Sequence, residues 1–453
     1  MARKFKRVDY EEALEMTVKV GDVLPPDHLA HFVVFVIAQL DLRAIYEKYA
    51  PVGAPPYEPE ILLGLLFYGY ATGDFSSRQI EKKTKETLPF RFIAGGYEPD
   101  HSTLADFRKD NLAEIKELFV QILVVAIELG MLEVGNISLD GTKIHADASK
   151  SKAISYKRLL ELEPQLQAEV EELFALAEKA EHETIPAGMV IEDEVALRQE
   201  RLARLAKAKA VLEARAEVRY ELEKTEYEAK LREREAKEKA RGRKLGGRKP
   251  KPPTPGPRDK DQYNFTDPDS PIMKNSNNQG FDQHYNAQAA VEQSSILIVG
   301  HTLSDQPNDK QEAVPTLEAI PTEQIGQPNG AAMDNGYFSQ ANIEAFEAQG
   351  VEPYIATGRE SHHQSWQAFF AGQPDPPAED ASPKEKMAYK LKTDIGQAIY
   401  RLRKSTVEPV IGIIKEVLGF RQFSLRGLVK AAGEWNLVCI AFNLKRMHTL
   451  YYS

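Results

Sequence analysis

The chain has 453 residues, of which 42% are hydrophobic and 28% charged, which excludes a disordered protein and allows two or three domains with full cores. Its single cysteine, Cys439, excludes a disulfide framework and a cysteine-based zinc site, and is typical of a reducing cytoplasm. No apolar run suits a signal peptide or a membrane span, so we expect a cytoplasmic protein without a membrane partner. The net charge of -10 argues mildly against nucleic-acid binding, but such an average hides local basic patches.

Residues 1–135 are expected to form a domain of short helices joined by glycine turns. Apolar residues recur at helical spacing in the segments 29–40, 61–67 and 115–132. Lysines and arginines gather around 76–85 and 99–109. This pattern is compatible with a helix-turn-helix DNA reader, but composition alone favours a helical bundle whose lysines are solvated.

A different pattern begins after Gly135. Residues Asn136–Leu139 predict a short buried strand that ends at Asp140. Further on, the sequence predicts a hairpin of residues 285–291 and 296–302, and two more strands at 330–333 and 351–356. It also predicts three helical stretches, at 310–320, 343–349 and 384–453. This order is that of a ribonuclease H-like mixed sheet, so we predict an α/β catalytic domain made of residues 136–150 and 261–453.

Residues 151–260 are predicted to form an insertion in that domain. Up to about residue 239 the segment is almost all Ala, Glu, Lys, Leu and Arg, which is typical of long, solvated, coiled-coil-like helices. Pro186 predicts a helical hairpin broken near this position. The insertion ends in a basic, proline-rich linker that would contact DNA phosphates without reading sequence, or would simply be solvated; its candidate DNA-binding residues are Arg241, Arg243, Lys244, Arg248 and Lys249.

Three acids from distant parts of the chain stand out as candidate metal ligands. Asp140 follows the first predicted strand, Asp334 follows Ala-Ala-Met, and Glu408 lies in Val-Glu-Pro-Val. Carboxylates gathered at strand and helix ends are what a pair of divalent cations needs. Each acid also has a structural reading: Asp140 could start a turn after its strand, Asp334 begins a turn sequence, and Glu408 could close a capping box with Ser405. Asp309 is expected to cap the helix that follows it.

Seven short stretches carry a family resemblance. They are Gly95–Thr103, Leu139–Ile144, Asp267–Lys274, Tyr285–Ala290, Gln306–Lys310, Asp334–Ser339 and Glu408–Gly412. In their order and spacing they resemble the DDE transposases of bacterial insertion sequences, in the subgroup with an N-terminal helical domain and a C-terminal Tyr-Arg-Glu-Lys signature. The charged insertion resembles this family only in its general character.

The resemblance implies a catalytic triad of Asp140, Asp334 and Glu408 that binds two Mg²⁺ ions, for which Mn²⁺ can substitute. Asp140 is assigned as the ligand that bridges the two ions.

The signature itself implies DNA-binding roles for residues around Glu408. Its members correspond to Tyr400, Arg403, Glu408 and Lys415. The gap between Arg403 and Glu408 is one residue longer than in the family, so Lys404 competes with Arg403 for the basic role. Arg401 adds positive charge beside them.

The function that the resemblance implies is a transposase that binds terminal inverted repeats, cleaves the ends and joins them to target DNA. Its partners would be double-stranded DNA at the transposon ends and the target, and further copies of the chain in a homodimer or larger assembly. It would work at the nucleoid of a bacterial cytoplasm. An inactive or repurposed DNA-binding copy is the alternative. A stand-alone nuclease would share the acids but would not need an end-binding domain.

Overall fold

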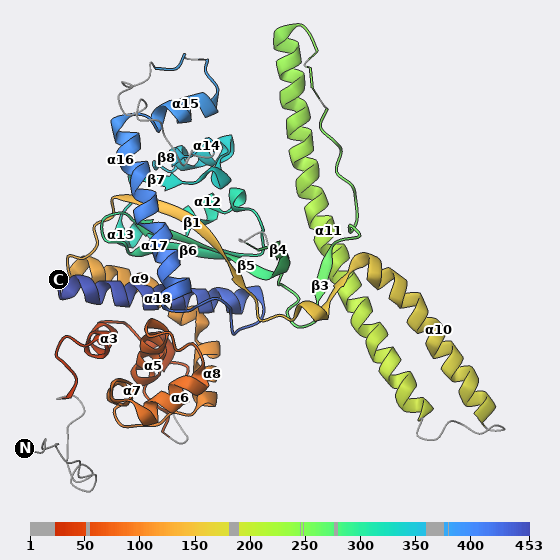
Figure 1. Ribbon diagram of the computed structural model, residues 1–453, viewed down its shortest axis with the longest axis horizontal. Coiled ribbons are helices and arrows are strands. Elements are labelled where there is room, and N and C mark those ends of the chain that lie inside the picture. Colours follow the sequence, from red (N-terminus) through yellow and green to blue (C-terminus); the bar gives the residue numbers. More distant parts are fainter. Residues whose placement is uncertain are drawn as a thin grey trace, which may run out of the picture. The chain divides into compact units, whose positions relative to one another are not determined.

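The computed structural model describes residues 23–453 except 51–54, 181–189, 245, 248, 276–279, 359–375 and 379, and leaves out the side chains of 178–180, 233, 237 and 241. These residues form two compact units (Figure 1). One unit contains the chain up to Asp147 and from His284 onward. The other contains Ala148–Lys274 and Gly280–Gln283. Within the described ranges, no helix combines the length and the apolar character that a membrane span requires.

The first unit begins with short helices, as the sequence predicts. They are α3 (Leu29–Ile37), α4 (Arg43–Tyr46), α5 (Pro59–Ala71), α6 (Ser77–Glu86), α7 (Leu88–Ile93), α8 (His101–Asp110) and α9 (Leu112–Glu128). Helix α5 is buried over most of its length, which explains its apolar sequence, and Pro59 occupies its first position, where no backbone N–H is needed. Asp100 caps α8 by accepting a hydrogen bond from the Thr103 N–H.

A long C-terminal helix, α18 (Leu428–Tyr451), is the central core element of this unit. It packs against α5, α9 and strand β6 (Ile298–Ser304), and most of its residues are buried. Its buried amides pair with backbone groups of its neighbours. Asn443 accepts from the N–H of Ile298 and donates to its carbonyl, and Asn436 donates to the carbonyl of Ile115. Burial of these polar groups is therefore compensated by hydrogen bonds.

The sheet of this unit is mixed. Its strands lie in the order β6–β5–β1–β7–β8, where β1 is Asn136–His145, β5 Phe281–Glu292, β7 Gly330–Met333 and β8 Glu352–Ile355. Strand β1 is antiparallel to β5 and parallel to β7. Strands β5 and β6 pair antiparallel, and β7 and β8 pair parallel. Pro353 is tolerated in β8 because this strand lies at the edge of the sheet.

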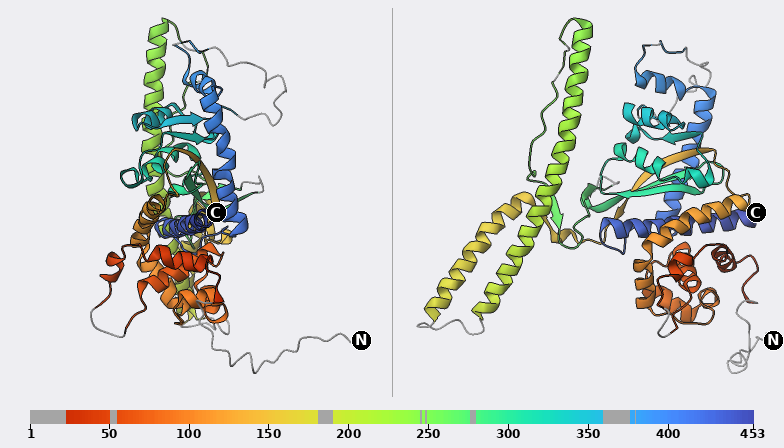
Figure 2. Two further views of the ribbon diagram at one scale, coloured as in Figure 1. Left: turned by 90° about the vertical axis from the view of Figure 1, so that its left-hand side faces the viewer. Right: turned by 180° about the vertical axis from the view of Figure 1, so that it is seen from behind.

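Two groups of helices cover the strands. Helices α12 (Ala313–Glu318) and α14 (Gln340–Ala348) lie on one side, and α16 (Asp394–Leu402) and α17 (Val407–Gly412) lie on the other (Figure 2). The shorter elements are α13 (Thr322–Ile325), α15 (Pro383–Lys390), the 3-10 turns η2 (Asp309–Gln311), η3 (Asn335–Tyr337) and η5 (Arg403–Ser405), and the π-helical segment η6 (Ile413–Val417).

The hairpin and the strands after it are confirmed, but the first strand is longer than predicted. Strand β1 continues to His145 because β5 extends alongside it, with Asp140 opposite Ala289 and His145 opposite His284. Asp140 therefore lies inside β1 instead of at its end. The helix expected over 310–320 is split into η2 and α12, with Glu312 between them.

The second unit contains the predicted helical hairpin. Helices α10 (Tyr156–Ala180) and α11 (Ile191–Arg241) pack against each other, and ion pairs from Arg198 to Glu169 and from Lys209 to Glu163 show that they run antiparallel. The predicted break at Pro186 lies outside the described residues. A small core beside the hairpin contains Leu159, Leu166, Leu205, Leu212 and Tyr263. Strands β2 (Ala153–Ser155) and β3 (Gln262–Asn264) pair there, and β4 (Ile272–Lys274) pairs with the first residues of β5.

Candidate active site

The pairing of β1 with β7 brings two of the predicted acids together. The last pair of this parallel ladder is Ser138 with Ala332. Asp140 and Asp334 each follow two residues later, so they lie at matching positions just past the paired residues, Asp140 within β1 and Asp334 directly after β7. One oxygen of each carboxylate is held by a local backbone N–H: Gly141 donates to Asp140 Oδ1 at 2.8 Å, and Gly336 donates to Asp334 Oδ1 at 2.7 Å.

Glu408 reaches the same place from the first turn of α17, which packs against β1. An arginine joins it to Asp140. In Arg403, Nη1 lies 3.1 Å from Asp140 Oδ2, and Nη2 lies 2.8 Å from Glu408 Oε1. The Arg403 side chain is only 10% exposed, whereas that of Glu408 is 45% exposed. The guanidinium is therefore a largely desolvated bridge between two acids that are far apart in the sequence.

A buried hydroxyl pair fixes α17 against β1. The Thr406 hydroxyl donates to the Ser138 hydroxyl at 2.8 Å, and the Gln293 side-chain amide donates to the same Ser138 oxygen at 3.0 Å. Both Thr406 and Ser138 are buried. Because Ser138 lies two residues before Asp140 and Thr406 lies two residues before Glu408, these bonds hold the backbones of both acids in register.

The electrostatics of Asp140 differ from those of a surface carboxylate. Burial raises the pKa of Asp140 to about 6; the Arg403 guanidinium and the Gly141 N–H oppose this rise, and the negative charges of Asp334 and Glu408 add to it. Asp140 thus interacts electrostatically with both of the other acids. A raised pKa caused by burial and like charges is typical of functional carboxylates, although buried ion pairs in structural networks also produce it.

Asp309 is a fourth carboxylate beside this site, and the prediction that it caps a helix is wrong. Asn308 caps η2 instead, by accepting from the Lys310 N–H. Asp309 Oδ1 accepts hydrogen bonds from the side-chain amides of Asn286 at 2.8 Å and Gln288 at 3.0 Å. The sequence did offer a signal for this network, because Asn286 and Gln288 are polar residues within the buried part of strand β5.

Tyr337 belongs to the same network and lies in η3, the turn that Asp334 caps. Its hydroxyl donates to Oε1 of Gln288, and its ring is fully buried. Burial first, and then the charges of Asp140, Asp309 and Asp334, raise the pKa of Tyr337 well above its usual value. The tyrosine therefore remains a neutral hydrogen-bond donor at this position.

The structural readings of the acids have different outcomes. Ser405 does not form a capping box with Glu408: its hydroxyl donates to the Leu402 carbonyl, and no side chain caps α17. The Glu408 carboxylate pairs with Arg403 instead. The turn reading of Asp334 is correct, since its carboxylate caps η3. Its other oxygen is not engaged in that cap, so the turn and a place in the acidic site are compatible.

The predicted DNA-binding residues near Glu408 occupy different environments. Arg401 and Lys404 are exposed. Tyr400 is half-buried, and the Arg403 guanidinium lies 6.0 Å from the centre of its ring. Lys415 donates from Nζ to the Thr142 hydroxyl at 3.0 Å and to the Lys143 carbonyl at 3.3 Å. Of the two competing basic residues, it is Arg403 that contacts the acids.

The basic linker belongs to the second unit. Arg243, Lys244 and Lys249 are exposed there. Arg248 and the side chain of Arg241 lie outside the described residues. In the N-terminal helices, Arg108 is buried under Tyr70 and Lys83 is paired with Asp74 at 2.6 Å, so neither of these two is displayed as a free surface charge.

The donor set fits a divalent cation in its chemistry, since Mg²⁺ prefers carboxylate oxygens and keeps several waters. Asp140, Asp334 and Glu408 interact electrostatically, and Asp140 Oδ2 and Glu408 Oε1 face one shared cation, the Arg403 guanidinium. The oxygens are not arranged as a finished site: across the described ranges, no three His, Cys, Asp or Glu side chains are grouped closely enough to hold a metal ion.

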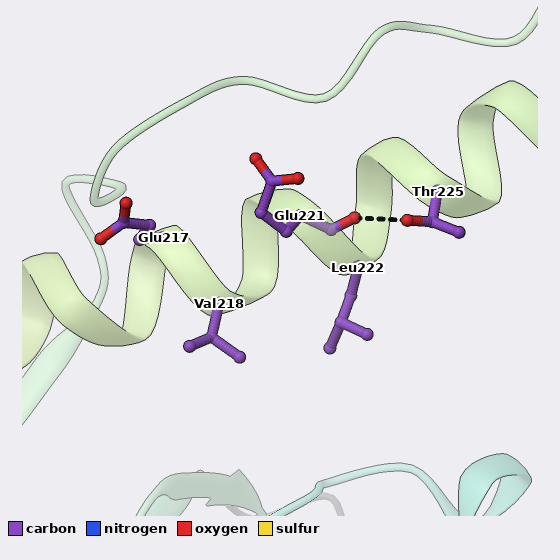
Figure 3. Close-up of a pocket in the computed structure, with 5 residues that line it drawn as sticks. All are labelled: Glu217, Val218, Glu221, Leu222 and Thr225. Atoms are coloured by element: carbon purple, nitrogen blue, oxygen red, sulfur yellow. Dashed lines mark hydrogen bonds between the residues drawn. The ribbon is translucent and has the colours of Figure 1, made fainter.

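A separate hollow of about 420 Å³ lies on α11. It is lined by Glu217, Val218, Glu221, Leu222 and Thr225 (Figure 3). Val218 and Leu222 point to the same side of the helix and are 64% and 62% exposed. The Thr225 hydroxyl donates to the Glu221 carbonyl at 2.9 Å, which is an ordinary bond within a helix.

Comparison with known families gives two matches. Residues 377–448, which contain Arg403 and Glu408, match a transposase DDE domain, and residues 18–110 match a transposase domain known as DUF772. Asp140 and Asp334 lie outside both matched ranges. No curated protein and no solved structure gives a significant match. With transposase domain sequences at both ends of the chain, the resemblance to the DDE transposases of insertion sequences is confirmed.

Proposed function

We propose that this protein is a DNA transposase that binds the terminal inverted repeats of an insertion sequence and catalyses metal-dependent strand cleavage and strand transfer. The observation that supports this most directly is the Arg403 bridge. It joins Asp140 in β1 to Glu408 in α17 beside Asp334, although the two acids are separated by most of the chain. The family matches support a transposase role independently of this geometry.

The strand order β6–β5–β1–β7–β8 supports a ribonuclease H-like catalytic domain made of residues 136–150 and 261–453. In this reading, residues 1–135 form the DNA-binding and assembly domain, and 151–260 form a helical insertion. The partners are double-stranded DNA at the transposon ends and the target. Two ends must be held together, which requires a homodimer or larger assembly at the bacterial nucleoid.

Asp140, Asp334 and Glu408 are the residues that would hold the two Mg²⁺ ions, with Mn²⁺ as a substitute. Bound there, the ions supply activation of the attacking water or 3′-hydroxyl and stabilisation of the leaving oxygen. The chain's own contribution is to fix the acids. Gly141 and Gly336 orient one carboxylate each, and Thr406 holds the backbone before Glu408 against β1. Lys415, together with Tyr400, Arg401, Arg403 and Lys404, supplies contacts to DNA.

The proposal is tested by a strand-transfer assay. Purified protein is given DNA that carries the gene's own flanking sequence, with Mg²⁺, beside Asp334→Asn and Glu408→Gln. Both variants keep side-chain size and lose charge. The matched control is Glu347→Gln, which changes an exposed carboxylate on α14. We expect cleavage and joining by the parent and the control, and a loss of at least about 100-fold in the two site variants.

The alternative function has a different signature in the same assay. An inactive or repurposed DNA-binding protein would bind the flanking DNA with the same affinity in all four forms and would cleave it in none. Cleavage of that DNA without joining, and without preference for its ends, would instead indicate a stand-alone nuclease. Equal strand transfer by the parent and Asp334→Asn would contradict the assignment of the acids.

A further inference from the structure

Arg403 lies between two of the three acids, and not all of its hydrogen-bond donors have a partner there. It contributes two charged hydrogen bonds, one to Asp140 and one to Glu408. Its Nε is buried and has no hydrogen-bond partner among the described residues. A buried guanidinium with an unused donor costs free energy that its ion pairs must offset. The position of Arg403 is therefore explained by its attraction to the acids around it.

The acids need a cation in this place. Burial penalises the charge of Asp140, and Asp334 and Glu408 add repulsion, while the Arg403 guanidinium favours ionised Asp140. In the same way, the charge of Arg403 is disfavoured by burial and favoured by Asp140, Glu408 and Asp334. Each partner thus keeps the other charged. Without a cation, three carboxylates gathered at one sheet edge would protonate or move apart.

Arg403 and a divalent cation cannot both occupy this place. Mg²⁺ binds carboxylate oxygens at about 2.1 Å and demands near-octahedral geometry, so oxygens that share one ion lie about 3 Å apart. In the structure the planar guanidinium stands between Asp140 Oδ2 and Glu408 Oε1 and contacts both. An ion that bridges these two oxygens must displace at least one nitrogen of Arg403. This exclusion also accounts for the unfinished arrangement of the three acids.

We propose that Arg403 is an exchangeable counter-ion of the active site, an inference that rests on the proposed transposase function. It holds Asp140 and Glu408 in the metal-free protein and gives them up when a divalent cation binds. The released guanidinium then binds a phosphate of the DNA end. Because binding couplings are reciprocal, the metal strengthens the contribution of Arg403 to DNA binding, and DNA strengthens metal binding.

The exchange is tested first by titrating Mn²⁺ alone into the protein and following the heat of binding. Arg403→Gln removes the competing cation, and we expect it to bind Mn²⁺ about tenfold more tightly than the parent. Lys430→Gln, which removes an exposed lysine on α18, is expected to leave the affinity unchanged. Arg403→Lys keeps a charge but cannot bridge two acids in the same way, so its affinity is expected to fall between those of the parent and the glutamine variant.

The outcomes separate this proposal from the function on which it rests. Equal or weaker Mn²⁺ binding by a folded Arg403→Gln overturns the exchange and leaves the metal site standing. Absence of Mn²⁺ binding in the parent and in every variant overturns the metal site of the proposed function, and the exchange with it. If Arg403→Gln fails to fold, Arg403→Lys decides: an affinity no higher than that of the parent overturns the exchange.

A second measurement tests the released guanidinium without any catalysis. Binding of the flanking DNA is compared in EDTA and in Ca²⁺, for the parent, Arg403→Gln and the control Lys430→Gln. We expect Arg403→Gln to lose affinity about tenfold in Ca²⁺ and to match the parent in EDTA, since the guanidinium is held by the acids when no metal is bound. An equal loss in both conditions overturns the coupling. Failure of the parent to bind its flanking DNA in either condition overturns the proposed function instead.

Discussion

The side-chain amide of Gln288 donates to Asp309 Oδ1 at 3.0 Å, directly against Gly141, the residue that follows Asp140. This contact joins strand β5 to the turn η2 across the middle of β1. A Cβ atom at residue 141 would lie 2.2 Å from Gln288 Nε2 and 2.9 Å from Asp309 Oδ1. A side chain at this position would therefore displace the buried Gln288 amide from its place against Asp309.

Gly141→Ala is expected to break the Gln288–Asp309 hydrogen bond and to shift the strand that carries Asp140. Overpacking of this kind costs about 1–3 kcal/mol of stability, and strand transfer is expected to fall further because Asp140 is displaced. Urea unfolding and the transfer assay measure the two effects. Gly412→Ala is the control, since a Cβ there meets nothing within 4 Å and residue 412 is in helix α17. Equal stability of the two variants would contradict the steric argument.

A second prediction concerns Glu434, which is fully buried in α18. Its carboxylate accepts hydrogen bonds from the Tyr70 hydroxyl and from the N–H groups of Ser424 and Leu425, and it lies 3.7 Å from the Arg108 guanidinium. Glu434→Ala leaves Arg108 buried without its counter-charge and is expected to cost about 3–5 kcal/mol. Glu434→Gln keeps the shape and some of the hydrogen bonds, so a smaller loss of about 1–3 kcal/mol is expected.

Urea unfolding of the parent and the two Glu434 variants checks this order. The comparison with the double variant Arg108→Met/Glu434→Ala is informative, because removing both charges together should cost less than removing the carboxylate alone. Similar small losses in Glu434→Ala and Glu434→Gln would show that the charge of Glu434 does not matter for folding.

The elements that the sequence predicted well are those with strong local patterns. The short apolar run Gly330–Met333 is a strand with the expected bounds, and the charged residues between 156 and 241 form two helices. Local periodicity was sufficient in these cases, because each segment's own side chains determine which face is buried. Strand β1 was predicted too short because its length is set by β5, which lies more than 100 residues away in the sequence.

The acidic site was predicted less completely, for a related reason. Asp140, Asp334 and Glu408 were selected by resemblance, but the alternative readings were judged by local spacing alone. Ser405 and Glu408 have the spacing of a capping box, yet Arg403 binds the glutamate instead. Local spacing predicts a cap at Asp309, and this prediction is wrong because the partners of Asp309, Asn286 and Gln288, come from strand β5. Long-range pairing of polar side chains leaves little trace in local sequence.

A third prediction concerns pH. His301 in β6 is partly buried, and its Nε2 lies 2.9 Å from Asn436 Oδ1. Burial lowers the pKa of His301 from 6.5 to about 4, the charge of Lys116 adds to this, and the hydrogen bond to Asn436 opposes it. Between these two values the unfolded chain binds more protons at this residue than the folded chain does. The stability that neutral His301 provides is therefore full above pH 6.5 and is lost as the pH falls towards 4.

The size of this pH effect is about 3 kcal/mol, from about 1.4 kcal/mol for each unit of pKa difference. Free energies of unfolding measured between pH 4 and 7 for the parent and His301→Gln check it. The difference between the two curves should shrink as the pH falls, since the variant has no proton to take up at this position. Parallel curves would mean that the pKa of His301 is the same in the folded and the unfolded chain, which contradicts the prediction. Acidic groups that titrate nearby affect both proteins alike.

The last prediction concerns Lys415, which contacts Thr142 and the Lys143 carbonyl beside Asp140. Burial lowers the pKa of Lys415, with a smaller contribution from Arg421. A lysine that binds a DNA phosphate near the acids contributes to the salt dependence of binding. Lys415→Gln is then expected to weaken binding of the flanking DNA and to reduce the slope of log affinity against log salt by about 1. Lys430→Gln, which removes an exposed lysine on α18, is the matched control. An unchanged slope together with a lower free energy of unfolding would mean that Lys415 only ties the π-helical segment to β1, and would remove it from the set of DNA contacts.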